Sequence, residues 1–427
     1  MSEYLSTGPY KGVRDFYPAD AAIEQYIFDS WRATAERFGF ERYDASILEP
    51  AELYKAKGAE NEEIVNEQTY TFTDRGEREV TLRPEMTPTV ARMIAGAHRR
   101  HELTFPVRWY SIPNLFRYER MQRGRLREHW QLNCDIFGGD AVAADVEIIA
   151  LAYQLLIDCG ATPEMFEIRV NNRAEAREIL EQHGIRDSET QRQITRLNDR
   201  IDKMSSDDYR AELVKLTENA DELIATYRRQ HDLTYSVVPA DSACGKLVTA
   251  LGALGIENAR VNHTLSRGFD YYTGTIFEIF DTSPENNRAL LGGGRYDNLT
   301  ALFSDDPISG VGFGMGDVTM RDFLETHDLL PAHVRQTAPE LVVIPAEPEQ
   351  NLECHRIACE FRRRGRRVAV DYGTRKLKKK IGDAADRGAG YVLVVGSEEL
   401  EQGTYTVKNL ADGTERSGTL EELTELT

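Results

Sequence analysis

The sequence predicts an α+β domain with a helical insertion, followed by a small α/β domain. Three observations predict this architecture. Residues 70–137 and 262–281 contain alternating apolar runs separated by turn residues, which is typical of strands in a sheet. Residues 173–232 instead carry charged residues, Gln and Leu at helical spacing, with almost no aromatic residues. Beyond residue 340, apolar strands alternate with helical patterns, which indicates a largely parallel sheet.

The first domain is predicted to begin with an amphipathic helix over residues 20–38, where apolar side chains recur at helical spacing. Residues 70–84 predict a hairpin that bends at Arg75-Gly76. Two further strands are predicted at 107–118 and 130–137, joined by a charged loop.

A long amphipathic helix is predicted at Val142–Cys159, and a strand follows at Phe166–Val170. We place the first domain at 1–325, with the insertion at about 173–240, a linker at 326–339 and the second domain at 340–427. The linker carries two prolines and no strong periodicity. A disordered acidic tract is the alternative for the insertion, because its apolar stripe is thin.

The charge of the chain limits the partners that it can bind. Its 427 residues have a formal net charge of -19, which argues against a protein whose whole surface binds a polyanion. Ten basic residues nevertheless lie between Arg362 and Lys380, with Asp371 as the one acid, so that this window carries +9. Such a cluster predicts a local patch that contacts phosphates, and a pair of solvated helix faces is the alternative.

The five cysteines (134, 159, 244, 354 and 359) form no CxxC motif and no disulfide framework. We therefore expect buried thiols in a reducing compartment, and no structural metal. Residues 146–157, the longest apolar stretch, include Glu147 and Gln154 and are too short to span a bilayer. The N-terminus shows no apolar signal segment. We expect a soluble, cytoplasmic protein that does not enter a membrane.

The most informative segment has two predicted strands on either side of a loop rich in arginine. Arg117 and Glu119 lie two positions apart on the first strand, so their side chains share one face and can address one ligand. A guanidinium suits a phosphate, because its planar fork makes two parallel hydrogen bonds. The alternative is a solvated hairpin whose charges pair with one another.

Three other segments attract attention. Residues 267–274 (RGFDYYTG) combine an arginine, an acid and two tyrosines, which is a poor composition for a core unless it serves a site. Residues 292–297 (GGGRYD) let the backbone approach a ligand closely, or form a tight bulge between strands. Glu85 and Thr87 share one face after a strand. Neither GxxxxGK[ST] nor GxGxxG is present, which disfavours a P-loop or Rossmann site.

Together these segments resemble class II aminoacyl-tRNA synthetases of the histidyl-tRNA synthetase family, over nearly the whole chain. Motif 2 of that class is similar to residues 116–138 (FRYERMQRGRLREHWQLNCDIFG). The two histidine-specific motifs are similar to residues 267–274 and 292–299. The family's opening resembles residues 11–18 (KGVRDFYP), and its anticodon-binding domain resembles residues 341–427. The resemblance implies a class II catalytic domain built on an antiparallel sheet.

The resemblance also implies a histidine–tRNA ligase that uses ATP with Mg2+. Arg117 would hold the α-phosphate and the histidine carboxylate, and Glu119 would read the adenine amino group. Arg267 would stabilise the transition state, where positioned positive charge has its largest effect. The residues implied for ATP binding are Arg117, Glu119, Arg125, Arg127 and His129.

Histidine recognition is implied for a second set of residues. These are Glu85, Thr87, Gln131, Asp135, Arg267, Tyr271, Tyr272 and Tyr296. The first three would grip the α-amino group, Asp135 and Tyr272 would hydrogen-bond the two imidazole nitrogens, and the last tyrosine would close the pocket. Amino acids without both imidazole nitrogens would leave the polar groups of the site unpaired. The expected partners are L-histidine, tRNA(His) and a second copy of the chain in a homodimer.

Three positions depart from the family pattern. Thr319 stands where motif 3 supplies an arginine for the γ-phosphate, so another arginine must serve that phosphate or ATP binds weakly. His129 replaces an adenine-stacking Phe, and Ser46 replaces a proline of motif 1. Two alternatives remain: a paralogue without charging activity, such as the regulatory subunit of ATP phosphoribosyltransferase, and a tRNA-binding module without catalysis.

Overall fold

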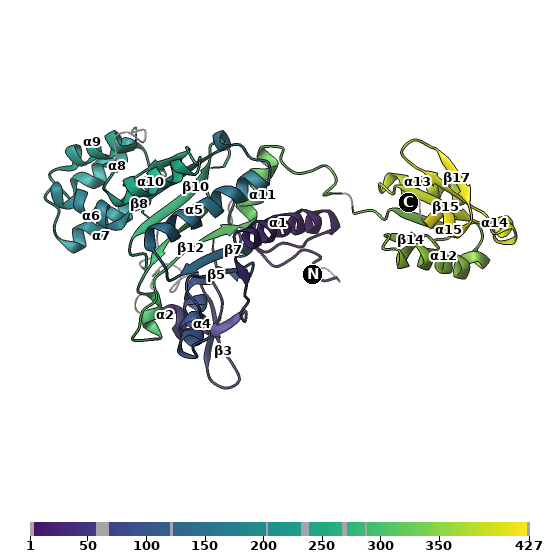
Figure 1. The fold of residues 1–427 in the computed structure, drawn as a ribbon, viewed down its shortest axis with the longest axis horizontal. Helices are drawn as coiled ribbons and strands as arrows, with labels where there is room; N and C mark the ends of the chain where they lie inside the picture. The colour runs from purple at the N-terminus through teal and green to yellow at the C-terminus, as the bar shows by residue number, and fades with distance from the viewer. Residues whose placement is uncertain are drawn as a thin grey trace. The chain divides into compact units, whose positions relative to one another are not determined.

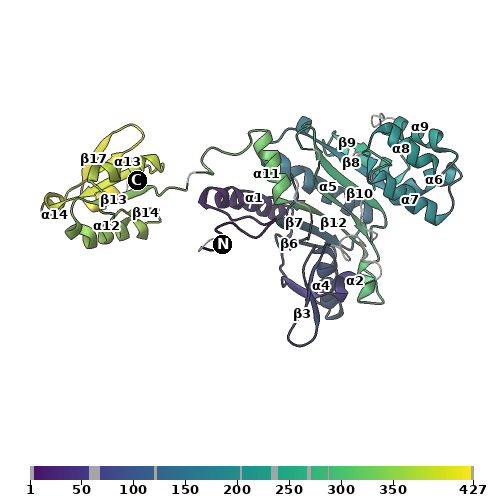
Figure 2. The same cartoon turned by 180° about the vertical axis from the view of Figure 1, so that it is seen from behind.

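The structure is a computed structural model. It describes residues 4–56, 68–119, 123–201, 204–231, 239–266, 271–286, 288–335 and 337–424. The chain divides into two compact units, a larger one formed by Met1–Tyr17 and Ile23–Pro331 and a smaller one formed chiefly by Ala332–Thr427. Figures 1 and 2 show the ribbon from opposite sides.

The larger unit is built on one long sheet whose central strands are antiparallel. Only the two outermost pairings of the main path are parallel, β1 with β5 and β8 with β9. In order across the sheet, the strands are β1 (Glu41–Arg42), β5 (Val107–Ser111), β7 (Glu128–Phe137), β12 (Gly310–Gly316), β11 (Ala289–Tyr296), β10 (Thr275–Asp281), β8 (Phe166–Asn172) and β9 (Ala259–Val261), with β6 (Asn114–Phe116) paired to β7. The predicted antiparallel sheet is confirmed.

Helices cover one face of this sheet. These are α1 (Pro18–Arg37), α5 (Ala141–Asp158) and α11 (Asp317–Thr326), with α10 (Ala243–Ala253) packed against α5. In Figure 1, α5 and α11 lie along the strands that they contact. The side chain of Asp140 accepts a hydrogen bond from the backbone of Ala143 and so caps α5. This cap explains why the helix begins one residue before its predicted start.

The opposite face carries a small second sheet and helix α4 (Thr87–Arg99). The second sheet contains the predicted hairpin, whose strands are β3 (Tyr70–Thr73) and β4 (Glu79–Leu82), together with β2 (Leu48–Pro50), and α2 (Glu52–Lys55) follows it. Val90 and Ile94 of α4 are fully buried in a core that includes Phe137 and Tyr296 of the main sheet. Helix α4 therefore forms one wall above this face.

Three strand predictions need correction. The predicted strand 107–118 is broken into β5 and β6, because Pro113 has no N–H group to donate to a neighbouring strand. Among the described residues of the predicted strands over 262–281, a strand forms only from Thr275 onward, and residues 267–270 lie outside the described part. The glycines at 292–294 lie inside β11, not in a bulge or loop, and both neighbours of β11 pair with them.

The segment beginning at Arg173 folds into four short helices, seen together at one end of the unit in Figure 2. They are α6 (Arg173–Gln182), α7 (Ser188–Asn198), α8 (Ser206–Val214) and α9 (Ala220–His231). Ile194, Leu213 and Leu223 are fully buried in a core that belongs to these helices alone. Their described residues form a packed unit, not a disordered acidic tract. The boundary near 240 stays a prediction, since residues 232–238 lie outside the described part.

The smaller unit has a five-stranded sheet with helices on both faces. Its strands, in order across the sheet, are β14 (Val368–Val370), β13 (Leu341–Pro345), β15 (Tyr391–Val395), β16 (Tyr405–Asn409) and β17 (Glu415–Gly418). The first three are parallel and the last two are antiparallel. Its helices are α12 (Asn351–Arg363), α13 (Leu377–Asp386), α14 (Ser397–Gln402) and α15 (Leu420–Thr424). The prediction of alternating strands and helices is confirmed.

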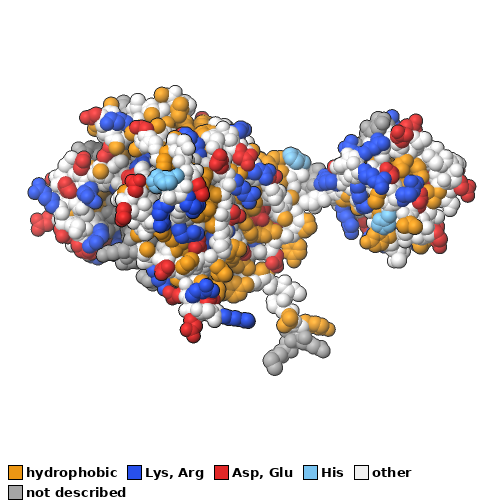
Figure 3. All heavy atoms as spheres, turned by 60° about the horizontal axis from the view of Figure 1, so that its bottom comes forward, with side chains coloured by type: hydrophobic (Ala, Val, Ile, Leu, Met, Phe, Trp, Pro, Cys, Tyr) orange, Lys and Arg blue, Asp and Glu red, His pale blue; other side chains and the backbone are white. Residues whose placement is uncertain are grey.

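The basic window of the smaller unit is less positive than its sequence suggests. Arg366 and Arg367 lie near Glu340, Arg363 pairs with Glu360, and Lys379 and Arg375 pair with Asp383. These three acids lie outside the window and reduce its +9 to +6. Lys and Arg side chains are nevertheless prominent on the face of this unit that Figure 3 presents. No helix in the described ranges is long and apolar enough to cross a membrane.

Candidate active site

A row of glycines lies in the middle of the sheet, on the face opposite α5. Gly310, Gly312 and Gly314 alternate in β12 with Val311, Phe313 and Met315, which are buried on the helical face. The register pairs Gly312 with Asp135 and, across the other edge, with Gly294. Residues paired in this way point to the same face. The glycines therefore form the floor of the candidate site.

The floor is lined with glycine because neighbouring side chains lie directly over it. A Cβ atom at Gly312 would come 2.2 Å from Oδ1 of Asp135, and one at Gly314 would come 2.6 Å from Cδ of Gln131. In the same way, Gly310 gives room to Tyr296 and Gly294 gives room to Tyr272. These glycines thus accommodate four predicted site residues and not only a ligand. Glycine at every second position of one strand is the sequence pattern from which this floor could have been predicted.

One end of the pocket is defined by Asp135 and Tyr296. The Tyr296 hydroxyl donates a short hydrogen bond to Oδ1 of Asp135, and both side chains are almost fully buried. Burial raises the pKa of Asp135 to about 7, although the Tyr296 hydrogen bond opposes this rise. The buried Tyr43, which the sequence analysis missed, lies close enough to feel the charge of Asp135.

A second buried carboxylate, that of Glu85, lies on the α4 side of the pocket. The Tyr271 hydroxyl donates to Oε2 of Glu85 over 2.9 Å, and Tyr271 also interacts with Thr87. Burial raises the pKa of Glu85 to about 7, while Arg117 and Tyr271 lower it. Tyr271 stands edge-on to Tyr272, with 5.0 Å between ring centroids. The structure therefore brings these predicted residues together in one aromatic pocket.

Arg117 lies beside both Glu85 and Glu119. Its Nε donates to the carbonyl of Pro84 over 2.9 Å, which fixes the side chain at the start of α4. Burial lowers the pKa of its guanidinium, and the two glutamates raise it. An arginine held between carboxylates stays charged and keeps donors for an anion. Arg117 is therefore not part of a solvated hairpin.

The loop after Arg117 carries the remaining predicted ATP residues. Arg125 forms an ion pair with the buried Glu119. Arg127 instead packs over the ring of Tyr118, with its Cζ 3.9 Å from the centroid, and donates to the Tyr10 hydroxyl. Gly12, at a positive φ of 91°, lies against the Arg127 stem, because a Cβ there would be 2.6 Å from Cδ. The opening segment 11–18 thus holds this loop in place.

His129 lies among arginines. Burial, together with the positive charges of Arg117, Arg14 and Arg125, lowers its pKa to about 3. The ring is therefore neutral at pH 7. A neutral, flat ring in a positive field is suited to stack on a base while the arginines bind phosphate.

The segment that departs from motif 3 has a structural role. Asp317 forms an ion pair with Arg14, with 2.5 Å between Oδ2 and Nη2. Its Oδ1 accepts a hydrogen bond of 2.9 Å from the backbone N–H of Trp130. Thr319 donates to the carbonyl of Leu290 at 3.0 Å. The first turn of α11 therefore ties β7, β11 and the N-terminal segment together without a charged side chain at position 319.

Arg295 of the GGGRYD segment belongs to the other face of the sheet. It is buried against Asp145 of α5, with 2.6 Å between Nη2 and Oδ1, and also donates to Ser309 and Ala141. A buried pair of this kind is structural, since removal of one partner leaves an uncompensated charge. The GGGRYD segment thus supplies one residue of the candidate site, Tyr296, and one structural residue, Arg295, which pairs with Asp145.

Arg267, predicted as catalytic and as histidine-binding, lies outside the described residues. Among those that are described, one group has metal-binding side chains close together: Glu175, Cys244 and His263, with ligand atoms within 4.8 Å of one another. Oε1 of Glu175 accepts a hydrogen bond from the backbone N–H of Cys244, at the start of α10. Burial raises the pKa of the Cys244 thiol, which disfavours the thiolate. The predicted lack of a structural metal stays a prediction.

Comparison with known proteins agrees with this architecture. The family model described as histidyl-tRNA synthetase matches residues 12–317, and the one described as anticodon binding domain matches residues 340–426. A crystal structure of histidyl-tRNA synthetase from Nostoc sp. PCC 7120 is 21% identical, covers 99% of both chains and has a TM-score of 0.80. An antiparallel catalytic sheet with this arginine loop, joined to an anticodon-binding domain, defines a class II aminoacyl-tRNA synthetase.

Curated relatives narrow the class to one family. Histidine–tRNA ligase of Leptospira biflexa is 40% identical over 418 residues, which covers 95% of this chain and 94% of the relative. The ligase of Thermoplasma volcanium is 37% identical over 424 residues, with 97% and 96% covered. The chain belongs to the histidyl-tRNA synthetase family. This membership implies ATP-dependent catalysis and favours the ligase over the regulatory paralogue.

Proposed function

We propose that the chain joins L-histidine to tRNA(His) in two steps, using ATP as its magnesium complex. The observation that carries the proposal is the pair of buried carboxylates, Glu85 and Asp135, at two positions in one tyrosine-lined pocket beside Arg117. Histidine offers an ammonium and an imidazole N–H to two such acceptors, and a carboxylate to a guanidinium. The pocket and this amino acid are therefore complementary in charge.

Recognition of the side chain would come from Asp135. Its Oδ1 already accepts from Tyr296, so its other oxygen is left to accept from an imidazole N–H. The second imidazole nitrogen would contact Tyr272, whose ring lies over Gly294. Glu85, with Thr87 beside it, would hold the α-ammonium. A neutral aliphatic side chain would leave the second carboxylate oxygen of Asp135 without a donor from the substrate, which is costly in a buried position.

In the first step a histidine carboxylate oxygen would attack the α-phosphorus of ATP, and pyrophosphate would leave. Arg117 would hold both reacting groups, since a guanidinium donates to two oxygens at once. Arg267 would add positive charge at the α-phosphate. Glu119 would accept from the adenine amino group, and His129, which is neutral at pH 7, would stack on the base. ATP bound in this way would replace the ion pair between Glu119 and Arg125.

In the second step a ribose hydroxyl at the 3' end of tRNA(His) would attack the histidyl carbonyl, and AMP would leave. The smaller unit would bind the anticodon region. Arg364, Lys376 and Lys378 are three of the exposed basic residues in its window. They are suited to contact phosphates. We further propose a homodimer that works in the cytoplasm.

The proposal predicts that histidine binding near pH 7 releases protons. The pKa of Glu85 and that of Asp135 are both about 7, so each carboxyl is partly protonated at that pH. A bound ammonium and imidazole N–H favour the ionised carboxylates and lower both pKa values, so protons leave as histidine binds. Calorimetry in two buffers that differ in ionisation enthalpy measures this release, which we expect to total up to about one proton at pH 7.

The matched variant for this measurement is Glu85→Gln, which keeps the shape of the side chain but cannot titrate. It should bind histidine more weakly and release fewer protons than the wild type. Equal proton release by the two proteins would contradict the assignment of Glu85 to the ammonium.

Charging of tRNA tests the proposed function against the regulatory paralogue. We expect the full-length chain to attach labelled histidine to tRNA(His) in an ATP-dependent reaction. A chain that binds histidine and ATP but forms neither adenylate nor charged tRNA would support the paralogue instead.

A further inference from the structure

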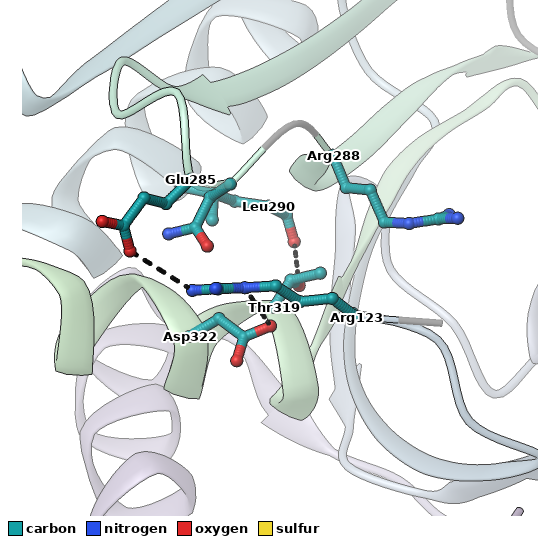
Figure 4. Close-up of a pocket in the computed structure, with 8 residues that line it drawn as sticks. Arg123, Glu285, Arg288, Leu290, Thr319 and Asp322 are labelled. Atoms are coloured by element: carbon teal, nitrogen blue, oxygen red, sulfur yellow. Dashed lines mark hydrogen bonds and ion pairs between the residues drawn. The ribbon is translucent and has the colours of Figure 1, made fainter. Parts of the chain in front are cut away.

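A second pocket lies beside the arginine loop, where β11 and α11 begin. Figure 4 shows its lining, which includes Arg123, Glu285, Arg288, Thr319 and Asp322. Thr319 stands at the position where motif 3 of the class supplies an arginine. Thr319 therefore adds no charge to the pocket, and the positive charge there comes from other residues.

Two arginines enter this pocket, and they differ in their surroundings. Arg123 lies across it between two acids, with its guanidinium nitrogens 3.9 Å from Glu285 and 4.0 Å from Asp322. Figure 4 shows the Arg288 side chain extending in another direction, away from both acids. The positive charge of Arg123 is thus offset by two acids of the same pocket, while the Arg288 side chain points away from those acids.

The stem of Arg288 and the methyl group of Thr319 both lie against Gly124 of the arginine loop. A Cβ atom at Gly124 would lie 3.0 Å from Cδ of Arg288 and 3.3 Å from Cγ2 of Thr319. Gly124 has a positive φ of 73°, so the loop turns tightly there and leaves space for the stem. A longer side chain at position 319 would therefore extend close to the stem of Arg288.

The head of Arg288 lies close to groups already placed at the ATP site. It is about half buried, and its pKa is lowered first by burial and then by the positive charge of Arg125, while Glu119 raises it. Two guanidiniums that repel one another in a partly buried position favour the binding of an anion between them. With adenine at Glu119 and the α-phosphate at Arg117, the outer phosphates of ATP would extend to this place.

We propose that Arg288 binds the outer phosphates of ATP, together with Arg125, and so supplies the positive charge that position 319 lacks. This inference rests on the proposed function, because it uses the same ATP site. It assigns Arg288 as a binding residue for the pyrophosphate leaving group, and the neutral Thr319 as the residue that leaves room for it.

Comparison of ATP with AMP tests the proposal, since AMP has no outer phosphates. In calorimetric titrations of the full-length protein, Arg288→Ala should weaken ATP binding by about 10- to 100-fold and AMP binding by less than about twofold. Arg288→Gln, which preserves the length of the stem, should behave in the same way if the alanine variant folds poorly. In the Arg288→Ala background, Thr319→Arg should restore much of the ATP affinity, because it places a guanidinium close to the position of the Arg288 stem.

The control is Arg321→Ala, which removes one positive charge from α11 but pairs with Glu325 outside this pocket. It should leave both affinities unchanged. Equal weakening of ATP and AMP in the Arg288 variants, or no weakening of either, would overturn the proposal. A wild-type chain that binds ATP but never activates histidine would refute the proposed function instead, and the ATP–AMP comparison would still decide the role of Arg288.

Discussion

Replacing Arg117 by alanine should reduce histidine-dependent ATP–pyrophosphate exchange by about 10³-fold or more. A donor aimed at charge that develops in the transition state contributes about 10² to 10³ in rate by itself. Arg117 also favours the ionised form of Glu85, since its charge lowers the pKa of that carboxyl. Without it the pKa of Glu85 should rise further above its usual value, and the α-ammonium would lose its partner at neutral pH. Exchange kinetics at saturating ATP measure the combined loss.

The matched control is Arg78→Ala in the hairpin of the small sheet. Arg78 is highly exposed and pairs with Asp74 within its own turn. An exposed pair of this kind contributes little, so exchange should stay near the wild-type rate. If Arg117→Ala kept more than about a tenth of wild-type exchange while folding normally, Arg117 would not hold the reacting groups.

Gly312→Ala should be the most damaging single-methyl change in the floor of the pocket. The new Cβ would lie 2.2 Å from Oδ1 of Asp135 and 2.7 Å from the carbonyl oxygen of Cys134. One of these atoms belongs to the backbone of the paired strand, so relief requires Asp135 to leave its position. We expect kcat/KM for histidine to fall by about 10² or more, with a loss of about 1 to 3 kcal/mol in the free energy of unfolding. Steady-state kinetics and thermal unfolding measure the two effects separately.

Gly252→Ala provides the control for the same chemical change. Gly252 lies in helix α10, and a Cβ there would meet no atom within 4 Å. Because alanine favours a helix over glycine by up to about 1 kcal/mol, this variant should be as stable as the wild type or slightly more so. Normal histidine kinetics in Gly312→Ala would show that the glycine floor does not position Asp135.

Much of the fold follows from local sequence patterns. Alternation predicts the hairpin at 70–84 and the strand that carries Asp135, and helical spacing predicts α1 and α5 within a few residues. The arginine loop and the two tyrosines at 271–272 also identify the site, because such polar clusters need a purpose in a core. These features are local, so the residues that form them lie close together in the chain.

The parts of the fold and of the site that local patterns do not predict depend on which strands become neighbours in the sheet. The role of Gly312 appears only when β12 pairs with β7, and Arg295 points to α5 because of the register of β11. Likewise, Arg288 reaches the pocket of Thr319 through the folding of two distant segments. The +9 window of the smaller unit loses part of its charge to acids that are remote in sequence, such as Glu340. Pairings over long sequence distances of this kind leave no local signal.

The central claim is that the tyrosine-lined pocket around Asp135 and Glu85 selects histidine. ATP–pyrophosphate exchange by the full-length protein, measured with each of the twenty amino acids in turn, tests this claim most directly. We predict exchange with histidine that exceeds exchange with any other amino acid by about 10³-fold or more, because a site built to hydrogen-bond a polar side chain rejects analogues that lack it. Comparable exchange with another amino acid, or exchange with histidine that survives unchanged in Asp135→Ala, would contradict it.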